Sequence, residues 1–420
     1  MAEQEYITVQ EALTAVLNGI SVLPAEEVPL LEALGRVLAE PVVARDSLPP
    51  FANSSMDGYA LRAADLADVT TENPATLRVL ADIAAGSVPN VTITSGTAAR
   101  IMTGAPLPPG ADAVVPVEDT NESWRNVERP LPDYIQINRQ VAANDYVRHI
   151  GEDIEAGQVV LQAGHVLRPQ EVGTLAALGV SRVPVIRRPQ VGVLATGDEL
   201  IPVDAPLQPG KIRNSNGYAQ IAQVMALGAV PISLGIARDT EEDVRNKLQK
   251  GLDAGVDLFI SSAGVSVGAY DIVKTVLQDG GNVNFWRVRM RPGKPLAYGQ
   301  YSDVPYLGLP GNPVSAMVSF ERFARAAILK MAGHQQLDRP KIKVILQEEI
   351  HSDGRESYIR GVVSKQGDNY VATTTGGQGS HMMTSLVKAN ALLIVPEGVT
   401  YVPVDGNLTA WMIDWPESVF

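Results

Sequence analysis

The 420-residue sequence contains no cysteine. This absence excludes disulfide bonds, thiolate metal ligands and cysteine nucleophiles, and it favours a cytoplasmic protein. Long apolar runs are also missing; the run Ala391–Val395, for example, ends at a proline, so we expect no membrane-spanning helix. The first residues lack the basic and apolar regions of a signal peptide. We therefore predict a cytoplasmic protein that does not bind a membrane.

Positive charge is scarce, because 34 Lys and Arg residues face 47 Asp and Glu residues, giving a net charge of −13. A broad basic surface for nucleic acid is therefore not expected. One segment differs, since residues 287–294 carry four cations and no acid. A local basic segment in an acidic protein indicates an anion site, although an exposed edge strand carrying arginines is equally compatible with this segment alone.

Several motifs of known chemistry are absent as well. The five histidines form no H-x-H or H-E-x-x-H arrangement, so any metal should be held by oxygen ligands. No Walker loop is present, and no G-x-G-x-x-G follows the first strand of the α/β region. Nucleotide hydrolysis by a P-loop and dinucleotide redox chemistry are therefore disfavoured.

The chain length and the changing residue patterns predict several domains. From residue 189 onward, apolar strands alternate with helices, which predicts a parallel sheet covered by helices on both faces. The strands expected there are 191–195, 230–236 and 258–262, and a long helix is expected over 313–331. Residues 46–150 and 338–420 have the short apolar runs of β domains, residues 151–186 combine strand and helix, and residues 8–45, including 30–38, have helical spacing.

Ligands of an open α/β sheet bind in the loops beyond the carboxyl ends of its strands. Two such loops are rich in glycine and serine and precede helices, which makes their backbone N–H groups suitable for binding an anion. Ordinary tight turns with helix caps are the simpler alternative. The candidate anion-binding residues of the two loops are Gly264, Ser266, Gly268, Gly311, Asn312 and Ser315.

Four acids are predicted at the same edge of the sheet: Asp198, Glu199, Asp239 and Asp271. Asp239 and Asp271 would also suit helix caps. Carboxylates beside phosphates commonly hold Mg²⁺, so this edge is a candidate magnesium site.

A serine-hydrolase interpretation competes with the anion loop, because residues 264–268 match G-x-S-x-G between a strand and a helix. Against it, no His-Gly-Gly oxyanion segment is present, the predicted sheet has few strands left after this loop, and the basic segment would have no role. We favour the anion-loop interpretation.

Taken together, the polar segments resemble those of the MoeA family of molybdopterin molybdenumtransferases, whose relatives include the E domain of gephyrin. The order and spacing of the segments carry the resemblance over about 330 residues. The segments are FANSSMDGYA (51–60), RIMTGAPLP (100–108), GEDI (151–154), ATGDEL (195–200), ISSAGVSVGAYD (260–271), MRPGKPLAYG (290–299), GLPGNPVSA (308–316) and TTTGGQGSHM (373–382).

The resemblance implies an enzyme that inserts molybdenum from molybdate into adenylylated molybdopterin, with Mg²⁺ as cofactor and AMP as product. It implies an elongated homodimer that has no nucleic-acid partner, with the molybdopterin adenylyltransferase as a further candidate partner. The fold class is multidomain α/β plus β. The implied domains are an α/β molybdopterin-binding domain (1–25 and 187–332), a small α+β linking domain (26–45 and 152–186), a β-rich domain (46–151) and a C-terminal β-barrel-like domain (333–420).

Residue by residue, the resemblance assigns catalytic roles to five acids, three of which are also candidate metal ligands: Glu199, Asp239 and Asp271. The other two catalytic candidates are Asp57 and Asp153. Substrate-binding roles outside the two glycine loops go to Thr103, Arg148, Arg287, Arg291, Lys294, Arg360 and Ser380. Arg289 matches no such position and is expected on the surface.

Two alternatives of other kinds stay open at this point. The α/β domain could only adenylylate molybdopterin, or the chain could be a non-catalytic scaffold that binds molybdopterin and partner proteins. The acids in both halves of the chain favour the molybdenumtransferase.

Overall fold

The computed structural model describes residues 6–122, 130–262 and 269–415, and it describes only the backbone of residues 269–271. The chain forms two compact units. The larger unit comprises Met1–Val28, Ala33–Ala39 and Pro184–Phe420, and the smaller unit comprises Pro29–Glu32 and Glu40–Val183. The finer division into four domains stays a prediction.

A seven-stranded sheet forms the centre of the larger unit, with strand order β1-β18-β20-β21-β17-β13-β16. Within the described part of the chain, β20 is the one strand of this sheet that runs against the others, because it pairs antiparallel with both β18 and β21. The strands are β1 (Tyr6–Ile7), β13 (Gln190–Thr196), β16 (Val230–Ala237), β17 (Leu258–Ser262), β18 (Gly281–Val288), β20 (Pro295–Tyr301) and β21 (Val304–Leu309).

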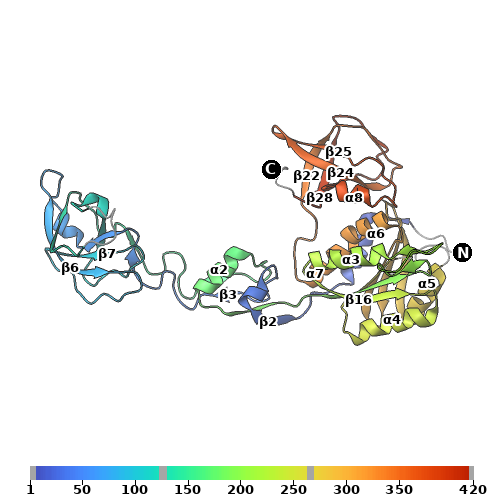
Figure 1. Ribbon diagram of the computed structural model, residues 1–420, viewed down its shortest axis with the longest axis horizontal. Coiled ribbons are helices and arrows are strands. Elements are labelled where there is room, and N and C mark those ends of the chain that lie inside the picture. Colours follow the sequence, from blue (N-terminus) through green and yellow to red (C-terminus); the bar gives the residue numbers. More distant parts are fainter. Residues whose placement is uncertain (1–5, 123–129, 263–268, 416–420) are drawn as a thin grey trace. The chain divides into compact units, whose positions relative to one another are not determined.

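Helices cover both faces of this sheet, as expected from the alternation of strands and helices. One core joins the sheet to α1 (Val9–Asn18), α3 (Ser215–Ala226), α6 (Pro313–Ser319) and α7 (Arg325–Met331). A second core joins the opposite face to α4 (Glu241–Asp253) and α5 (Ala269–Asp279). In Figure 1, α3, α6 and α7 lie above β16 and α4 lies below it. The three-layer α/β arrangement is therefore confirmed.

Several sequence-based details of this layer need correction. The sheet is mixed rather than wholly parallel, because β20 returns along β18 in a tight antiparallel pair. The predicted long helix is interrupted by a π-helical segment, Phe320–Ala324, between α6 and α7. Residues 30–38 hold a 3-10 turn (Leu30–Ala33) instead of a helix, because β2 (Ala25–Pro29) precedes it directly and the chain then becomes irregular.

The C-terminal part of the larger unit is a small barrel, as predicted. Its strands follow the order β19-β24-β25-β22-β28-β26, and β26 also pairs with β24, which closes the ring. The strands are β19 (Met290–Arg291), β22 (Lys341–Leu346), β24 (Glu356–Gln366), β25 (Asn369–Thr374), β26 (Ala391–Val395) and β28 (Asn407–Met412), with α8 (Thr384–Lys388) beside them. Tyr358 and Trp411 of the barrel share the core of the α/β layer, so the two parts pack as one body.

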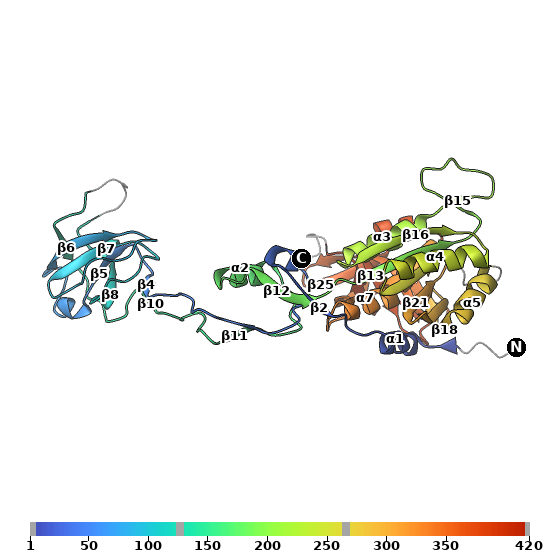
Figure 2. The same ribbon diagram turned by 90° about the horizontal axis from the view of Figure 1, so that it is seen from below.

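Two short pairs of strands complete the larger unit. The pair β14 (Leu200–Ile201) and β15 (Ile212–Arg213) belongs to a segment that projects from the α/β layer next to β16 (Figure 2). The second pair is β23 (Ile350–His351) with β27 (Tyr401–Val402). Near the junction of the two units, β2 pairs with β12 (Arg182–Ile186).

The smaller unit is β-rich, in agreement with the sequence. Its five-stranded sheet has the order β8-β5-β7-β6-β9, and β10 with β4 and β11 with β3 form two short pairs. The strands are β3 (Val42–Val43), β4 (Asn53–Ser54), β5 (Gly58–Leu61), β6 (Ala75–Ile83), β7 (Thr97–Ile101), β8 (Ala113–Pro116), β9 (Tyr134–Ile137), β10 (Val147–Arg148) and β11 (Val159–Leu161), and α2 (Pro169–Ala177) follows them. No helix among the described residues is long and apolar enough to cross a membrane.

A pair of helical glycines tests the packing of α4 on the sheet. A Cβ atom at Gly251 of α4 would lie 2.4 Å from the ring of Phe259, which is buried in β17, whereas a Cβ at Gly173 of α2 would meet nothing within 4 Å. Replacing an exposed helical glycine by alanine stabilises a helix by about 1 kcal/mol, while overpacking a core costs about 1–3 kcal/mol.

We therefore expect Gly251→Ala to lower the midpoint of urea denaturation and Gly173→Ala to raise it. Circular dichroism of both variants would measure these midpoints. A higher midpoint for Gly251→Ala would show that Phe259 moves aside at little cost.

Candidate functional site

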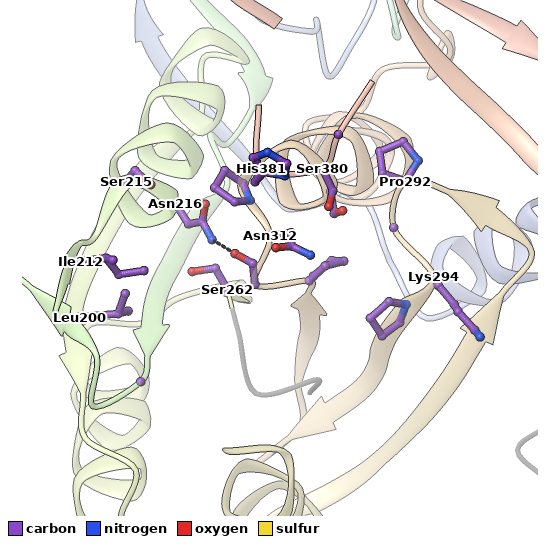
Figure 3. A pocket seen from close by; sticks show the side chains of 18 of the residues that line it. Leu200, Ile212, Ser215, Asn216, Ser262, Pro292, Lys294, Asn312, Ser380 and His381 are labelled. Carbon is purple, nitrogen blue, oxygen red and sulfur yellow. Dashed lines mark hydrogen bonds between the residues drawn. The ribbon is translucent and has the colours of Figure 1, made fainter. Parts of the chain in front are cut away.

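The candidate site is a cavity of about 1070 Å³ at the carboxyl edge of the central sheet. Parallel neighbours end together there, because Thr196 lies opposite Ala237, and Ser262 lies opposite Leu309. The loops after β13, β16 and β21 therefore lie at this edge, as the sequence predicted. Figure 3 shows the lining side chains, with Ser380 and His381 of the barrel above those of the sheet edge.

The cavity collects many of the residues singled out in the sequence. Two predicted acids, both cations of the Arg-Pro-Gly-Lys turn, the second glycine loop (311–315) and one predicted residue of the barrel all line it. These residues are Glu199, Asp239, Arg291, Lys294, Gly311, Asn312, Ser315 and Ser380.

The two acids lie in neighbouring loops that follow β13 and β16. The Glu199 carboxylate folds back against Gly197, since a Cβ atom there would lie 2.5 Å from Glu199 Oε2. Gly197 also has a φ of +142°, a conformation that only glycine adopts readily. In the other loop, Asp239 Oδ2 accepts a hydrogen bond of 3.3 Å from the Asp198 N–H group, and the Asp239 N–H group donates to Asp198 Oδ1 at 3.2 Å.

Asp239 is not the cap of the following helix, which was the simpler alternative. Thr240 is the N-cap of α4, and its side chain accepts a hydrogen bond from the Asp243 N–H group. The Asp243 carboxylate accepts from the Arg238 N–H group. Asp239 therefore lines the cavity without capping a helix.

The described residues contain no group of three or more acids or histidines that could by itself hold a metal ion. Glu199 and Asp239 contribute carboxylates to the same cavity, which are the hard oxygen ligands that Mg²⁺ prefers. Mg²⁺ sites in phosphate-binding enzymes often use only one or two carboxylates, together with substrate oxygens and water. The donor set thus suits a cation shared with a bound phosphate, and not one held by protein ligands alone.

The basic segment supplies the positive side of the cavity. A hydrogen bond of 2.7 Å from the Val288 N–H group to the Lys294 carbonyl closes the turn that carries Arg291 and Lys294. The Arg291 guanidinium lies 3.6 Å from the Asp353 carboxylate. Lys294 Nζ lies 5.0 Å from the centre of the Tyr6 ring, and a hydrogen bond from this ammonium lowers the pKa of the Tyr6 phenol.

Two other arginines of this segment lie outside the cavity lining. Arg287 was predicted to bind substrate, but it is exposed on β18, with its guanidinium 5.8 Å from the Tyr6 ring centre. Arg289 pairs with Glu397 at 2.9 Å, in line with the surface role expected for it.

The second glycine loop is held by hydrogen bonds from two directions. Asn216 Nδ2 donates a hydrogen bond of 2.7 Å to the Gly311 carbonyl, drawn as a dashed line in Figure 3. The Val314 N–H group, in the first turn of α6, donates to the Ser380 carbonyl of the barrel at 3.0 Å. The loop is thereby fixed between α3 and the barrel.

Arg360, predicted to contact substrate, lies beneath the barrel loop instead of lining the cavity. It is only 1% exposed, and its guanidinium donates to Ser385 Oγ at 3.1 Å and to the Gly379 carbonyl at 3.3 Å. Burial, and secondarily the nearby Arg291, lowers the pKa of Arg360 to about 10, so it is still charged at neutral pH. In this geometry Arg360 supports the loop that contributes Ser380 to the cavity.

Polar atoms that the sequence did not single out also face this cavity. Thr196 and Ser262 are fully buried at the ends of β13 and β17, and their hydroxyl groups have no hydrogen-bond partner in the part of the chain that the structure describes. The same holds for Asn216 Oδ1. All three residues line the cavity, so a bound polar ligand would satisfy them. Their position at strand ends was the available signal, but serine and threonine are too common there to stand out.

The N-terminal candidates Asp57, Thr103, Arg148 and Asp153 lie in the smaller unit, and the direct contact of Asp57 with Thr103 defines what we call the Asp57 cluster. Asp57 Oδ1 accepts hydrogen bonds of 2.7 Å from both the N–H and the hydroxyl group of Thr103. β10 pairs with β4, which places Arg148 opposite Asn53 near the same segment. Asp153 lies further along the chain in a turn, and its N–H group donates a hydrogen bond to the Leu48 carbonyl. The structure thus joins Asp57 with Thr103.

Three residues that were predicted to bind the anion lie outside the described residues: Gly264, Ser266 and Gly268. Asp271 belongs to the first turn of α5, which begins at Ala269.

Known proteins resemble this chain along its whole length. Three family profiles match it: the MoeA N-terminal region (domain I and II) over residues 7–179, a probable molybdopterin binding domain over 192–330, and the MoeA C-terminal region (domain IV) over 343–404. A relative named molybdopterin molybdenumtransferase 2, from Mycobacterium tuberculosis, is 39% identical over 412 residues, which cover 96% of this chain and 99% of the relative. The chain belongs to the MoeA family.

Two further comparisons agree with this assignment. The molybdopterin molybdenumtransferase of Bacillus subtilis is 35% identical over 421 residues, covering 98% of this chain and 97% of that protein. A crystal structure of the MoeA protein from Pyrococcus horikoshii superposes with a TM-score of 0.81 at 32% identity, covering 97% of this chain and all of that one. The cavity draws on two of the matched MoeA regions, and the Asp57 cluster lies in the third.

Two neighbouring serines of β17 differ in their hydrogen bonding, which allows a ligand-binding role to be distinguished from a packing role. Ser261 Oγ accepts a hydrogen bond of 2.6 Å from the buried Tyr306 hydroxyl, whereas Ser262 Oγ has no partner among the described residues. Leaving a buried hydroxyl without its partner costs about 1–3 kcal/mol, and removing an unpaired one costs little.

Ser261→Ala should therefore lower the free energy of unfolding by about 1–3 kcal/mol. Ser262→Ala should leave it unchanged or raise it slightly. Urea denaturation of both variants measures the difference, and an equal loss in the two would mean that Ser262 has a structural partner.

Proposed function

We propose that this chain is a molybdopterin molybdenumtransferase, which transfers molybdenum from molybdate to adenylylated molybdopterin and releases AMP. The observation that carries the proposal is the meeting, in one cavity of a MoeA-family chain, of cations, carboxylates and hydroxyl groups that have no partner among the described residues. Relatives that cover nearly the whole chain are named for this activity.

The reactants of the proposed reaction are anions, and the cavity offers what they require. Arg291 and Lys294 would neutralise phosphate or molybdate oxygens, and the hydroxyl groups of Thr196 and Ser262 would donate to the same groups. Phosphate-ester or anhydride cleavage is accelerated by groups that stabilise the charge developing in the transition state. Glu199 or Asp239 would orient the attacking group or accept its proton.

Magnesium is part of this proposal as a cation shared between protein and substrate. Glu199 and Asp239, which line the cavity, would hold it together with phosphate oxygens. Bound there, Mg²⁺ would offset negative charge on the phosphate.

We also propose that the enzyme is a homodimer in which the Asp57 cluster of one subunit serves the cavity of the other. Two observations support this proposal. The catalytic candidates lie in two compact units, with Asp57 in the smaller unit and Glu199 and Asp239 in the larger one, and each unit has its own core. A partnership with the molybdopterin adenylyltransferase is compatible with this proposal, since that enzyme's product would be the substrate here.

Purified protein incubated with adenylylated molybdopterin, molybdate and Mg²⁺ tests the function directly. AMP release that depends on molybdate, together with molybdenum in the pterin product, supports the proposal. Adenylylation of molybdopterin from ATP would favour the adenylyltransferase alternative, and binding without any turnover would favour a scaffold. Omitting Mg²⁺ should slow AMP release.

Substitutions of Lys294 and Asp239 should impair different steps, substrate binding and AMP release respectively. Lys294 would contact a bound anion in ground and transition states alike, so Lys294→Ala should weaken substrate binding by about 1.5–3 kcal/mol. Asp239→Asn keeps an oxygen for the Asp198 N–H group but loses its charge, so it should bind substrate normally and release AMP much more slowly. Equilibrium binding and single-turnover AMP release separate the two effects. Normal binding by Lys294→Ala would contradict its role.

The homodimer is tested by light scattering. We expect a mass near twice the 44.8 kDa of the chain at micromolar concentration. Mixing inactive Asp57→Ala with inactive Asp239→Ala subunits should restore part of the activity if the sites are shared between subunits. A monomer with full activity would remove the shared-site proposal.

A further inference from the structure

One acid at the sheet edge has no place in the proposed chemistry. Asp198 lies between Gly197 and Glu199, both of which line the candidate cavity, but Asp198 itself does not. It faces a neighbouring cavity of about 930 Å³ instead, together with Tyr218, Lys211 and Arg238. Any influence of Asp198 on the reaction must therefore act through another residue.

Asp198 is bonded to Asp239 in both directions. The N–H group of each residue donates to the carboxylate of the other, at 3.3 Å from Asp198 to Asp239 and at 3.2 Å in return. Each residue lies two positions beyond the end of its strand, and the two parallel strands are paired up to Thr196 and Ala237. The Gly197 N–H group adds one more bond, to the Ala237 carbonyl at 3.2 Å. The reciprocal pair thus extends the connection between the strands into the two loops.

The loop that holds Asp198 is itself fixed on its other side. Lys211 Nζ donates to the Asp198 carbonyl at 2.6 Å, and the Ile212 N–H group donates to the Glu199 carbonyl at 2.8 Å. The Asp239 loop is fixed by the capped start of α4. The reciprocal pair therefore joins two supported loops, one carrying Glu199 and the other carrying Asp239.

We propose that Asp198 is a positioning residue that orients Asp239 for the reaction. Its carboxylate holds the Asp239 main chain and its N–H group holds one oxygen of the Asp239 carboxylate, which leaves the second oxygen for the cavity. This inference rests on the proposed function, since the effect on Asp239 is read as a reaction rate. A misplaced catalytic group binds substrate but turns it over slowly.

Three substitutions at one position and a matched control test the proposal. Asp198→Ala removes the acceptor and should slow single-turnover AMP release by roughly tenfold or more while changing substrate affinity by less than about threefold. Asp198→Asn keeps an oxygen for the Asp239 N–H group and should retain most of the rate. Asp198→Glu, with a longer side chain, should fall between them. Asp204→Ala, at an exposed aspartate of the same projecting segment, should behave as wild type.

The decisive measurement is a double-mutant cycle. If Asp198 acts through Asp239, adding Asp198→Ala to an Asp239→Ala enzyme should change the residual rate by less than about twofold. The same factor of loss in both backgrounds would overturn the proposal, and so would an Asp198→Asn enzyme as slow as Asp198→Ala, because the charge of Asp198 would then act directly.

Hydrogen exchange separates this proposal from the proposed function. In Asp198→Ala, the Asp239 amide should exchange faster than in wild type, whether or not the protein releases AMP. Unchanged exchange at Asp239 would overturn the reciprocal pair. A wild-type enzyme without AMP release would overturn the proposed function, and the exchange of Asp239 would then still decide whether Asp198 orients it.

Discussion

The parallel register of β13, β16, β17 and β21 is the constraint on which the candidate site depends. Because these strands end level with one another, their carboxyl ends and the loops after β13, β16 and β21 lie at one edge of the sheet. Residues more than 100 positions apart in the sequence, such as Glu199 and Ser315, thereby line a single cavity. A register shift of one residue would turn strand-end side chains such as Ser262 to the opposite face.

Residues of the barrel complete the lining of the cavity at the edge of the sheet. Its loop brings Ser380 and His381 to the cavity, and the bond from Val314 to Ser380 ties this loop to the start of α6. Buried Arg360 stabilises the loop from behind by donating to Ser385 and Gly379. Within the described part of the chain Arg360 pairs with no carboxylate, and burying an unpaired cation is costly. Its two guanidinium hydrogen bonds compensate for that cost only while the loop keeps this conformation.

Much of this arrangement could be predicted from the sequence, for identifiable reasons. The strands 190–196 and 258–262 are nearly continuous apolar runs, so their type and their loops were evident, and Glu199 and Asp239 were correctly placed together. The strands after residue 280 were missed, because Gly, Asn, Tyr and Pro interrupt their apolar pattern. The strand-count argument against a hydrolase was therefore wrong, since β18, β20 and β21 follow the loop.

Other features depend on contacts between distant segments and leave no local pattern. Nothing near Arg360 indicates that its side chain turns inward, and nothing near Asp198 indicates its bond to Asp239, 41 residues away. The Tyr6 ring meets Lys294 only because β1 pairs with β18. Such contacts are set by tertiary packing, whereas periodicity reports only the secondary structure and the buried face.

The π-helical segment Phe320–Ala324 has a geometric consequence for the long helix that ends the α/β layer. One residue of an α-helix corresponds to a rotation of roughly 100° about its axis, so the wider turn changes the phase between α6 and α7. The first part can then keep Ser315 toward the cavity while the second part turns Ala327, Ile328 and Met331 onto the core shared with α1. A single helix thereby serves a polar surface at one end and an apolar one at the other, without a break in the chain.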